Sequence, residues 1–389
     1  MGQGQTSRRQ PDLRKLRALN RTPSVHPSIA EIGREVWDAA ASPSGNPFVS
    51  YDFLHILEES GCVSAESGWS PCHLALDGAV MPLYLKTHSQ GEYVFDHGWA
   101  QAYERAGGAY YPKLQSAVPF TPVTGPRLMG ADPAARRALL IAAANLTAPL
   151  AASSLHITFL EEDEWRLAGE VGLLLRQDLQ FHWKNNNYAT FDDFLAQLSS
   201  SHRKTIRRER RLAAEGLEIH ALTGAELTEA HWDAFFAFYM DTGSRKWGRP
   251  YLNRKFFSLL GERMADKVLL IIARRGGHWI AGALNLIGRD ALYGRNWGSV
   301  EDIPFLHFEL CYYQAIEQAI DLGLSRVEAG AQGPHKIARG YLPAPVYSAH
   351  YIADRALRAP VARYLEQERA AVTEEMQALS QAYSPFSQG

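Results

Sequence analysis

The sequence predicts an α+β protein in which helices and sheets form layers, with two similar domains in tandem, each a mixed and mostly antiparallel sheet flanked by helices. Its 389 residues exceed the ~100–200 residues of a usual domain. With 46% hydrophobic and 21% charged residues, the chain can bury a sizeable core. We expect a disordered basic tail over residues 1–28, a first domain over residues 29–164, and a second domain, with a helix at its C-terminus, over residues 165–389.

An internal repeat is the main evidence for two domains. Two stretches about half the chain apart share the order strand, turn, strand, turn, strand. They read CHLALDGAVMPLYLKTHSQGEYVFDHGWA at residues 72–100 and LLIIARRGGHWIAGALNLIGRDALYGRNWGS at residues 269–299. Gly78 matches Gly277, and Trp99 matches Trp297 after a shift of one residue. Any two β-meanders share part of this pattern, but the order of turns and the half-length spacing favour a duplication.

Helical periodicity surrounds the second meander. It predicts helices over residues 201–215, 226–240, 253–264 and 303–322. The last of these is expected to have Asp302 as its cap and Pro304 in its first turn, and to end at Gly323. A strand over residues 326–329, a loop, and a strand through residues 347–352 follow. This order is that of acetyltransferase-like units, in which a strand and the following helix diverge and leave a cleft for an acyl donor.

Charge and cysteine usage exclude several classes of protein. Forty Lys and Arg against 42 Asp and Glu give a net charge of −2, so the chain as a whole has no electrostatic preference for nucleic acid or anionic membrane. Cys62, Cys72 and Cys311 have neither the number nor the spacing for a disulfide framework or a zinc site. No apolar run reaches the ~18–20 residues of a membrane span. We expect a cytoplasmic protein without a metal.

The densest polar cluster follows the strand over residues 326–329. It comprises Glu328, Gln332, His335, Lys336 and Arg339, interleaved with glycines. Loops after strand ends commonly carry reactive groups, and three cationic or imidazole side chains beside a carboxylate can bind an anion and supply an acid or a base. The alternative is a solvated turn whose charges pair with each other.

A second cluster follows the meander. Arg295 and Gly298 precede the helix that carries His307 and Glu309. A helix N-terminus suits a pyrophosphate or a developing oxyanion, so we expect the donor to bind here. Val300 departs from the acyl-CoA pattern, which has Gly or Ala at that place. His307 is flanked by Leu306 and Phe308, which equally fits a histidine of the core.

The helix Arg203–Arg211 is strongly basic. Lys204, Arg207, Arg208 and Arg211 share one face through i, i+3 and i+4 spacing. Such a face can hold the phosphates of a tRNA or of a CoA-type donor. It is equally typical of a solvated helix surface.

Residues of the first half are expected to line the same cleft. Four prolines over residues 110–128 exclude a helix there and predict an ordered loop that includes Lys113. Asp96 and Trp99 precede it and are candidate cleft residues. Lys246 of the second half and Tyr341, at the end of the polar loop, complete the candidate substrate-binding set.

Five segments carry a family resemblance. They read NPFVSYDFLHILEESG, PLYLKTHSQGEYVFDHGWAQAYERAG, YYPKLQSAVPFTPVTGPRL, HFELCYYQAIEQAI and GAQGPHKIARGY. With these segments the chain resembles the bacterial family of predicted N-acyltransferases described as peptidoglycan biosynthesis or recognition proteins, which is related to the FemAB-like branch of the GNAT superfamily. The resemblance implies two tandem GNAT-like acyltransferase domains. It also implies transfer of an acyl or aminoacyl group to an amine, such as that of a peptidoglycan precursor or peptide.

The chemistry that the resemblance implies needs no permanently bound cofactor, with acyl-CoA or aminoacyl-tRNA as co-substrate. FemAB-like relatives carry a long helical arm, and its absence from this sequence argues against tRNA. Amide formation needs an uncharged amine, for which Glu328 or His335 is the candidate base and Lys336 and His307 are further catalytic candidates. No activated Ser or Cys is visible, so direct transfer is preferred. The alternative function is a non-catalytic module that recognises peptidoglycan or peptide, and an RNA-binding protein ranks third.

Overall fold

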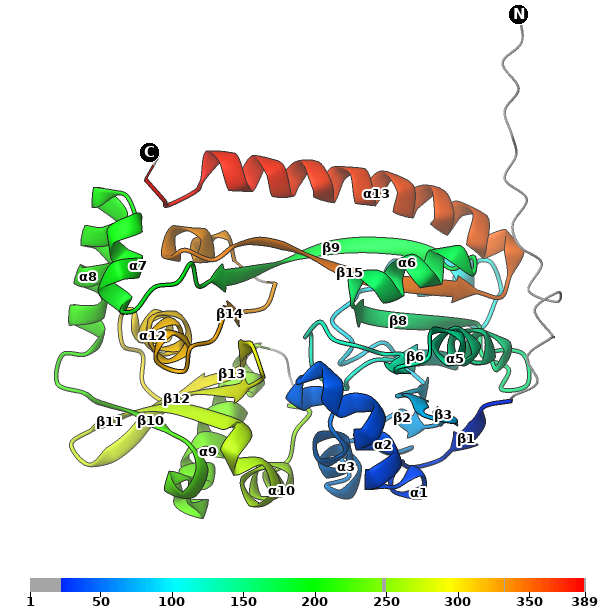
Figure 1. Ribbon diagram of the computed structural model, residues 1–389, viewed down its shortest axis with the longest axis horizontal. Helices are drawn as coiled ribbons and strands as arrows, with labels where there is room; N and C mark the ends of the chain where they lie inside the picture. Colours follow the sequence, from blue (N-terminus) through cyan, green and yellow to red (C-terminus); the bar gives the residue numbers. More distant parts are fainter. Residues whose placement is uncertain (1–21, 247–249, 332, 388–389) are drawn as a thin grey trace, which may run out of the picture.

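The computed structural model describes residues 22–246, 250–331 and 333–387 (Figure 1). The main feature is a large sheet of eleven strands, and a smaller sheet of four strands lies beside it. The smaller sheet has the order β1-β3-β4-β7. Its strands are β1 (Ser24–His26), β3 (His73–Leu76), β4 (Ala79–Met81) and β7 (Met129–Gly130). β1 lies within the segment expected to be a tail, and it pairs with β3.

The large sheet runs through both halves of the chain, in the order β10-β11-β12-β13-β14-β9-β15-β8-β6-β5-β2. In that order its strands are Glu218–Leu222, Val268–Arg275, His278–Ile287, Ala291–Ser299, Arg326–Glu328, Leu174–Lys184, Leu342–Ile352, Ser154–Leu160, Lys113–Ser116, Tyr84–Lys86 and Trp69–Pro71. The pairs β13–β14 and β6–β8 are parallel, and the other neighbours are antiparallel.

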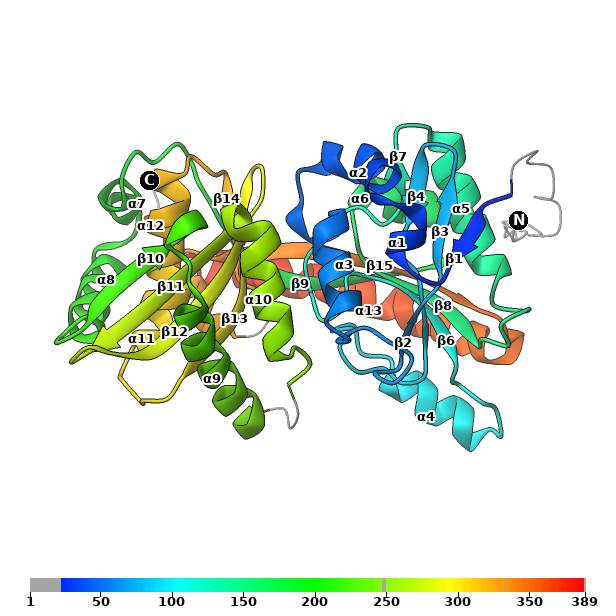
Figure 2. The same ribbon diagram turned by 90° about the horizontal axis from the view of Figure 1, so that it is seen from below.

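Helices cover both faces of the large sheet. In the first half they are α1 (Ile29–Ile32), α2 (Arg34–Ala41), α3 (Tyr51–Glu59), α4 (His97–Arg105), α5 (Pro133–Asn145) and α6 (Glu162–Glu170). In the second half they are α7 (Phe191–Gln197), α8 (Ser200–Ala213), α9 (Glu229–Lys246), α10 (Arg254–Met264), α11 (Leu306–Phe308), the π-helical turn η6 (Glu309–Tyr313), α12 (Gln314–Asp321), the 3-10 turn η7 (Pro334–Arg339) and α13 (Arg355–Ala382). Figure 2 shows α9 and α10 in front of β11–β13.

Side-chain caps explain several of the helix starts. Asp132 accepts a hydrogen bond from the Ala134 N–H at the start of α5, where Pro133 occupies the first turn. Asn253 caps α10 in the same way. None of the described helices is both long and apolar enough to span a bilayer.

The predicted fold class is confirmed, and the second half follows its predicted elements closely. The helices expected over residues 201–215, 226–240 and 253–264 are α8, α9 and α10, and the meander over residues 269–299 is β11–β13. Both parallel pairs are joined by a crossover that contains a helix, α5 between β6 and β8 and α12 between β13 and β14. The repeat is therefore visible in the topology.

Two predicted elements differ in detail. Residues 72–100 do not form one meander: β3 and β4 belong to the small sheet and β5 to the large sheet, while Trp99 lies in α4. The match of Trp99 with Trp297 of β13 is thus wrong. The helix after β13 begins at Leu306 rather than at residue 303, because Phe305 takes a left-handed conformation with φ 65°. Its end at Gly323, with φ 67°, is as predicted.

The strands that follow the two parallel pairs are exchanged between the halves. β9 follows β8 in sequence but pairs with β14, and β15 follows β14 but pairs with β8. β9 and β15 also pair with each other along nine residue pairs. In Figure 1 both strands cross between the halves, with α13 lying along them. β15, near the end of the chain, therefore completes the sheet of the first half. The expected domain boundary between residues 164 and 165 places this strand in the second domain instead.

Candidate active site

The candidate site lies where β13 and β14 diverge. The two strands pair in parallel through Ala291–Arg326, Leu292–Val327 and Tyr293–Glu328. β14 then ends, while β13 continues to Ser299. The other edge of β13 pairs with β12. A register shift between Leu284 and Asn285 of β12 leaves Arg295 of β13 without a pairing partner on this edge. Backbone groups in such a segment are free of the ladder and available to a ligand.

Glu328 has the environment of a general base. Its side chain is 4% exposed, and Oε1 accepts a hydrogen bond from Arg326 Nε at 2.9 Å. Oε2 is buried and has no hydrogen-bond partner among the described residues. Burial raises the pKa of Glu328 to about 7, although the charge of Arg326 opposes the shift. A carboxylate with such a pKa can accept a proton near neutral pH.

His182 on β9 is the neighbour of the unpaired oxygen. Its Nε2 lies 3.9 Å from Glu328 Oε2, too far for a hydrogen bond. Burial, together with the charge of Arg326, lowers the pKa of His182 to about 3, so the imidazole is neutral. On the same strand, Gln180 Nε2 donates to the Pro122 carbonyl at 2.7 Å. This bond holds the proline-rich loop over the face of the sheet that carries Glu328.

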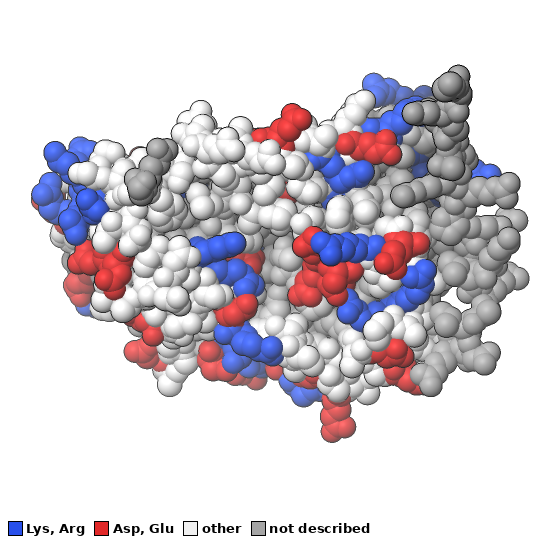
Figure 3. Space-filling view, turned by 45° about the horizontal axis from the view of Figure 1, so that its top comes forward, with Lys and Arg blue, Asp and Glu red and all other residues white. Residues whose placement is uncertain are grey.

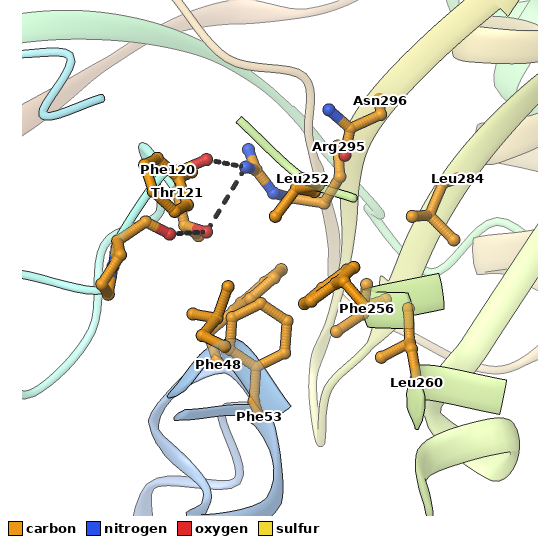
Figure 4. A pocket seen from close by; sticks show the side chains of 13 residues that line it. Phe48, Phe53, Phe120, Thr121, Leu252, Phe256, Leu260, Leu284, Arg295 and Asn296 are labelled. Carbon is orange, nitrogen blue, oxygen red and sulfur yellow. Dashed lines mark hydrogen bonds between the residues drawn. The ribbon is translucent and has the colours of Figure 1, made fainter. Parts of the chain in front are cut away.

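Arg295 also lies on this face and joins the two halves of the chain. Its Nη2 donates to the Phe120 carbonyl and lies 3.4 Å from Thr121 Oγ1. The guanidinium carbon is 5.6 Å from the centre of the Phe48 ring, and Phe48 in turn packs edge-on against Tyr293. Figure 4 shows Arg295 beside an apolar pocket lined from both halves.

The opposite face of the diverging strands carries aromatic rings and imidazoles. His307 packs against Trp297 at 5.2 Å and against Tyr312 at 5.3 Å between ring centres. The Tyr312 hydroxyl is 3.2 Å from His335 Nε2. Burial, with the nearby charges of Arg339 and Lys336, lowers the pKa of His335. The predicted residues His307 and His335 are thus close to each other, on the side of the sheet away from Glu328.

Lys336 holds the backbone of the polar loop. Its Nζ donates to the carbonyls of Ala329 and Gly330, the latter at 3.0 Å, and burial lowers its pKa to about 8. Tyr341 is completely buried and donates to the Tyr312 carbonyl at 3.1 Å. These two predicted site residues fix the shape of the loop that follows Glu328.

Two further predicted site residues form ion pairs within the chain, and a third lies in a close backbone contact. Glu309 accepts hydrogen bonds from Arg210, the closest at 3.0 Å. Arg339 donates to Glu209 at 2.8 Å. A Cβ on Gly298 would lie 2.3 Å from the Phe238 carbonyl oxygen, so β13 and α9 are in close contact there. We expected a pyrophosphate to bind against Gly298, but the backbone of α9 occupies the space beside this residue.

Lys113 lies on β6, separated from β14 by β9, β15 and β8, while Asp96 and Trp99 lie at the start of α4. Lys113 Nζ donates to Ser89 Oγ at 2.8 Å and to Glu92 Oε2 at 2.7 Å, and it also contacts Asp96. Burial works against ionisation of Asp96, but the charges of Lys113 and His156 lower its pKa overall. These residues form a separate buried network.

Two histidines that sequence reasoning missed complete this network. His156 Nδ1 of β8 and His350 Nδ1 of β15 are 2.8 Å apart. Trp99 packs against His350 at 5.0 Å between ring centres. Burial lowers the pKa of His156 to about 3 and that of His350 well below its usual value. The pair links β8 of the first half with β15, which is 194 residues later at the pair.

The remaining predicted site residues cannot be placed at the site. Gln332 lies outside the described residues. Lys246 ends α9, and its side chain is not among those described.

Sequence reasoning missed His182 and Arg326, which surround Glu328. The alternation of polar residues at Arg176, Asp178, Gln180 and His182 was the available signal, since every second residue of a strand faces the same side.

The basic helix presents its predicted face to solvent. Lys204, Arg207, Arg208 and Arg211 are exposed, while Arg210 turns inward to Glu309 and Glu317. Figure 3 shows Lys and Arg side chains gathered at the end of the molecule formed by α8.

The fold and the diverging parallel strands define a class of protein, the tandem GNAT-like units. Within it, the chain belongs to the FemAB-like family, described as peptidoglycan biosynthesis/recognition, whose family model matches residues 28–388. The family supports a peptidoglycan-related transferase of acyl or aminoacyl groups. None of the curated proteins matches the sequence significantly.

Solved structures share the fold at low sequence identity. FemX is 12% identical with a TM-score of 0.53, over 87% of this chain and 99% of that chain. L-PGS from Bacillus licheniformis is 11% identical with a TM-score of 0.51, over 83% of this chain and 98% of that chain. A conserved protein of unknown function from Bacteroides thetaiotaomicron is 10% identical with a TM-score of 0.50, over 85% and 99%.

Proposed function

We propose that the protein transfers an acyl or aminoacyl group from an activated donor directly to an amine, with Glu328 as the general base. The observation that carries this proposal is the buried Glu328 carboxylate with one unpaired oxygen at the point where β13 and β14 diverge. The amine attacks the donor carbonyl and gives its proton to Glu328 Oε2. The tetrahedral intermediate then collapses, the leaving group takes up a proton, and an amide remains.

Backbone N–H groups of β13 beyond Tyr293 are the proposed donors to the oxyanion. β14 leaves this segment unpaired on one side, and the irregularity at Arg295 interrupts pairing on the other. In studied hydrolases the loss of one such donor costs ~2.7–4 kcal/mol of transition-state stabilisation. Backbone geometry would therefore contribute as much as any side chain.

The donor is proposed to be acyl-CoA or aminoacyl-tRNA. The exposed basic face of α8 supports a nucleic-acid donor, because Lys204, Arg207, Arg208 and Arg211 have the spacing to contact successive phosphates. The acceptor is proposed to be an amine of a peptidoglycan precursor or peptide, which the family description supports.

Substitution of the base tests the proposal. Glu328→Gln keeps the shape of the side chain but removes its basicity, and should lower the rate of amide formation by about 10²–10⁴-fold. Purified protein would be incubated with acyl-CoA and aminoacyl-tRNA donors and peptidoglycan peptides, and amide products measured by mass spectrometry. Glu218→Gln, an exposed carboxylate on β10 of the same sheet, is the matched control and should keep the wild-type rate.

The pH dependence of the same reaction gives a second readout. Glu328 must be deprotonated to act, so the wild-type rate should rise as pH increases through about 7. An equal rate for Glu328→Gln would exclude this residue as the base.

A non-catalytic recognition module is the alternative, favoured by the word recognition in the family description. Saturable binding of peptidoglycan fragments without turnover of any donor would support it and would overturn the proposed transfer.

A further inference from the structure

Arg326, which holds the proposed base Glu328, also holds an acidic residue at the surface. Arg326 and Glu328 stand two residues apart on β14, so their side chains point to the same side of the sheet. Arg326 Nε donates to Glu328 Oε1 at 2.9 Å, and Arg326 Nη1 donates to Asp290 Oδ2. The side chain of Glu328 is 4% exposed and that of Asp290 is 55% exposed. One guanidinium is therefore shared between a buried and an exposed carboxylate.

Asp290 belongs to the turn between β12 and β13, and its backbone is joined to the start of β14. Its carbonyl accepts hydrogen bonds from the Ser325 N–H at 2.9 Å and from the Ser325 hydroxyl at 2.7 Å. The Ser325 carbonyl in turn accepts a hydrogen bond from the Asn185 N–H, just after β9, at 2.8 Å. The turn, β14 and the end of β9 thus fix one another at the place where Arg326 begins β14.

The first half of the chain supports the turn from its other side. The Arg289 N–H donates to the Gly45 carbonyl at 3.0 Å, and Arg289 Nη2 donates to the Ser42 carbonyl at 3.2 Å. A Cβ on Gly45 would lie 2.5 Å from Arg289 Cβ, so the two segments are in close contact. Exposed ion pairs are commonly weak because ordering two side chains costs entropy. Asp290 has a short side chain and a backbone that is held on both sides, so this cost is smaller here.

Several titratable or charged groups surround Glu328 and Arg326. They are Asp290 of the turn, Tyr293 of β13, His182 and Lys184 of β9, Lys336 of η7 and Glu161 before α6. Burial raises the pKa of Glu328 to about 7, the charge of Arg326 lowers it, and the charge of Asp290 raises it. His182 adds no charge, because burial lowers its pKa to about 3. Arg326 and Asp290 are therefore the charged neighbours to test.

We infer that Asp290, acting through Arg326, is a positioning residue that sets how readily Glu328 accepts a proton. An arginine that served Glu328 alone would hold it as a carboxylate and make it a poor base. Asp290 brings a second carboxylate to the same guanidinium and so weakens the hold of Arg326 on Glu328. The inference deepens the proposed function by naming what adjusts its base. It rests on that function only for the use of the proton in amide formation.

Direct titration of Glu328 tests the inference without any substrate. The carboxyl carbon would be followed by NMR in the full chain labelled with 13C-glutamate, and its signal identified by its loss in Glu328→Gln. Arg326→Gln should raise the pKa of Glu328 by about 1–3 units, because the opposite charge is lost. Asp290→Asn should lower it by about 0.5–1 unit, because a like charge is lost at a partly screened position. Asp266→Asn, which removes an exposed carboxylate paired with Lys267, is the matched control and should leave the pKa unchanged.

Asp290→Glu guards against a general effect of substitution on folding, since it keeps a carboxylate that can reach Arg326 and should restore most of the wild-type pKa. Opposite changes in Arg326→Gln and Asp290→Asn would support the inference. An unchanged pKa in Asp290→Asn, changes of the same direction in both variants, or a pKa in Asp290→Glu as low as in Asp290→Asn would overturn it.

The pH dependence of transfer separates this inference from the proposed function. If Glu328 is the base, the rising limb of the rate should move to higher pH in Arg326→Gln and to lower pH in Asp290→Asn, in step with the measured pKa. The expected pKa changes with an unmoved rate profile would support the role of Asp290 and exclude Glu328 as the base. An unchanged pKa in Asp290→Asn, with a rate that still depends on Glu328, would exclude the role of Asp290 and leave the proposed function in place.

Discussion

Glu328 and Lys336 lie at the two ends of one loop, yet burial has different consequences for their chemistry. One oxygen of Glu328 has no partner, so the carboxyl group can take part in a proton transfer. The ammonium group of Lys336 donates to two backbone carbonyls, so it is occupied by the loop itself. Both residues were predicted as catalytic because a sequence shows which side chains are chemically capable. It does not show which of them have intramolecular partners.

Arg295 and Glu309 illustrate the same limit. Both were predicted to bind the donor from their position around the end of the second meander. Glu309 is paired with Arg210 from α8, about 100 residues earlier in the chain, whereas Arg295 has no carboxylate partner among the described residues. Pairing between distant segments depends on the tertiary fold, which periodicity and spacing do not report.

Acid should destabilise the protein through the buried pair His156 and His350. The pKa of His156 is lowered to about 3 from 6.5 by burial and by Lys113, with Asp96 opposing and Arg176 adding to the shift. The unfolded chain therefore binds more protons than the folded protein between these values, and stability is greatest above pH 6.5 and falls as pH decreases. From pH 6.5 to pH 5 one such histidine contributes a loss of about 2 kcal/mol.

Urea unfolding at several pH values would measure this effect. His350→Gln should have a free energy of unfolding that falls less steeply with acid than that of the wild type. His278→Gln, an exposed position on β12, should follow the wild-type slope. A wild-type slope for His350→Gln as well would show that the pair is not responsible.

At the scale of elements, helices and the second meander could be predicted because their signals are local. The apolar spacing of α10 and the cap at Asn253 lie within one segment. The first meander failed because alternation specifies a strand but not the sheet that it joins: β4 and β5 are separated by two residues and enter different sheets. The late start of α11 depends on the φ of Phe305, which no residue preference predicts.

The close contact of β13 with α9 makes Gly298 a sensitive position. In Gly298→Ala the new Cβ would meet the Phe238 carbonyl only 2.3 Å away, and the backbone must shift. We expect a loss of about 1–3 kcal/mol in the free energy of unfolding. Gly98→Ala in α4 is the matched control, because nothing lies within 4 Å of its Cβ, and it should be neutral or slightly stabilising. Equal melting temperatures for the two variants would contradict the described packing.

At the scale of the molecule, the exchange of β9 and β15 joins the two halves into one sheet. β14 pairs on its two sides with β13 and β9, and β8 pairs with β6 and β15. Neither half can lose the exchanged strand without exposing a strand edge. The duplication in the sequence predicted two similar units, but not this exchange, because the order of elements is the same with or without it.

A single unfolding transition should follow from the exchange. We expect calorimetric and van't Hoff enthalpies to agree for the full chain, since neither half has a complete sheet alone. Tryptophan fluorescence and circular dichroism should give coincident urea midpoints. Removal of residues 342–389 should destabilise both halves together, and a stable, separately melting second half in that truncated protein would contradict this expectation.

The exchange also sets an order of events during synthesis. His156 on β8 meets His350 on β15, which is 194 residues later in the sequence. At ~5–20 residues per second, a ribosome needs roughly 10–40 s to make the intervening chain. During that time the nascent first half keeps an unpaired hydrophobic edge at β8, a period when chaperone binding would have the greatest effect on yield.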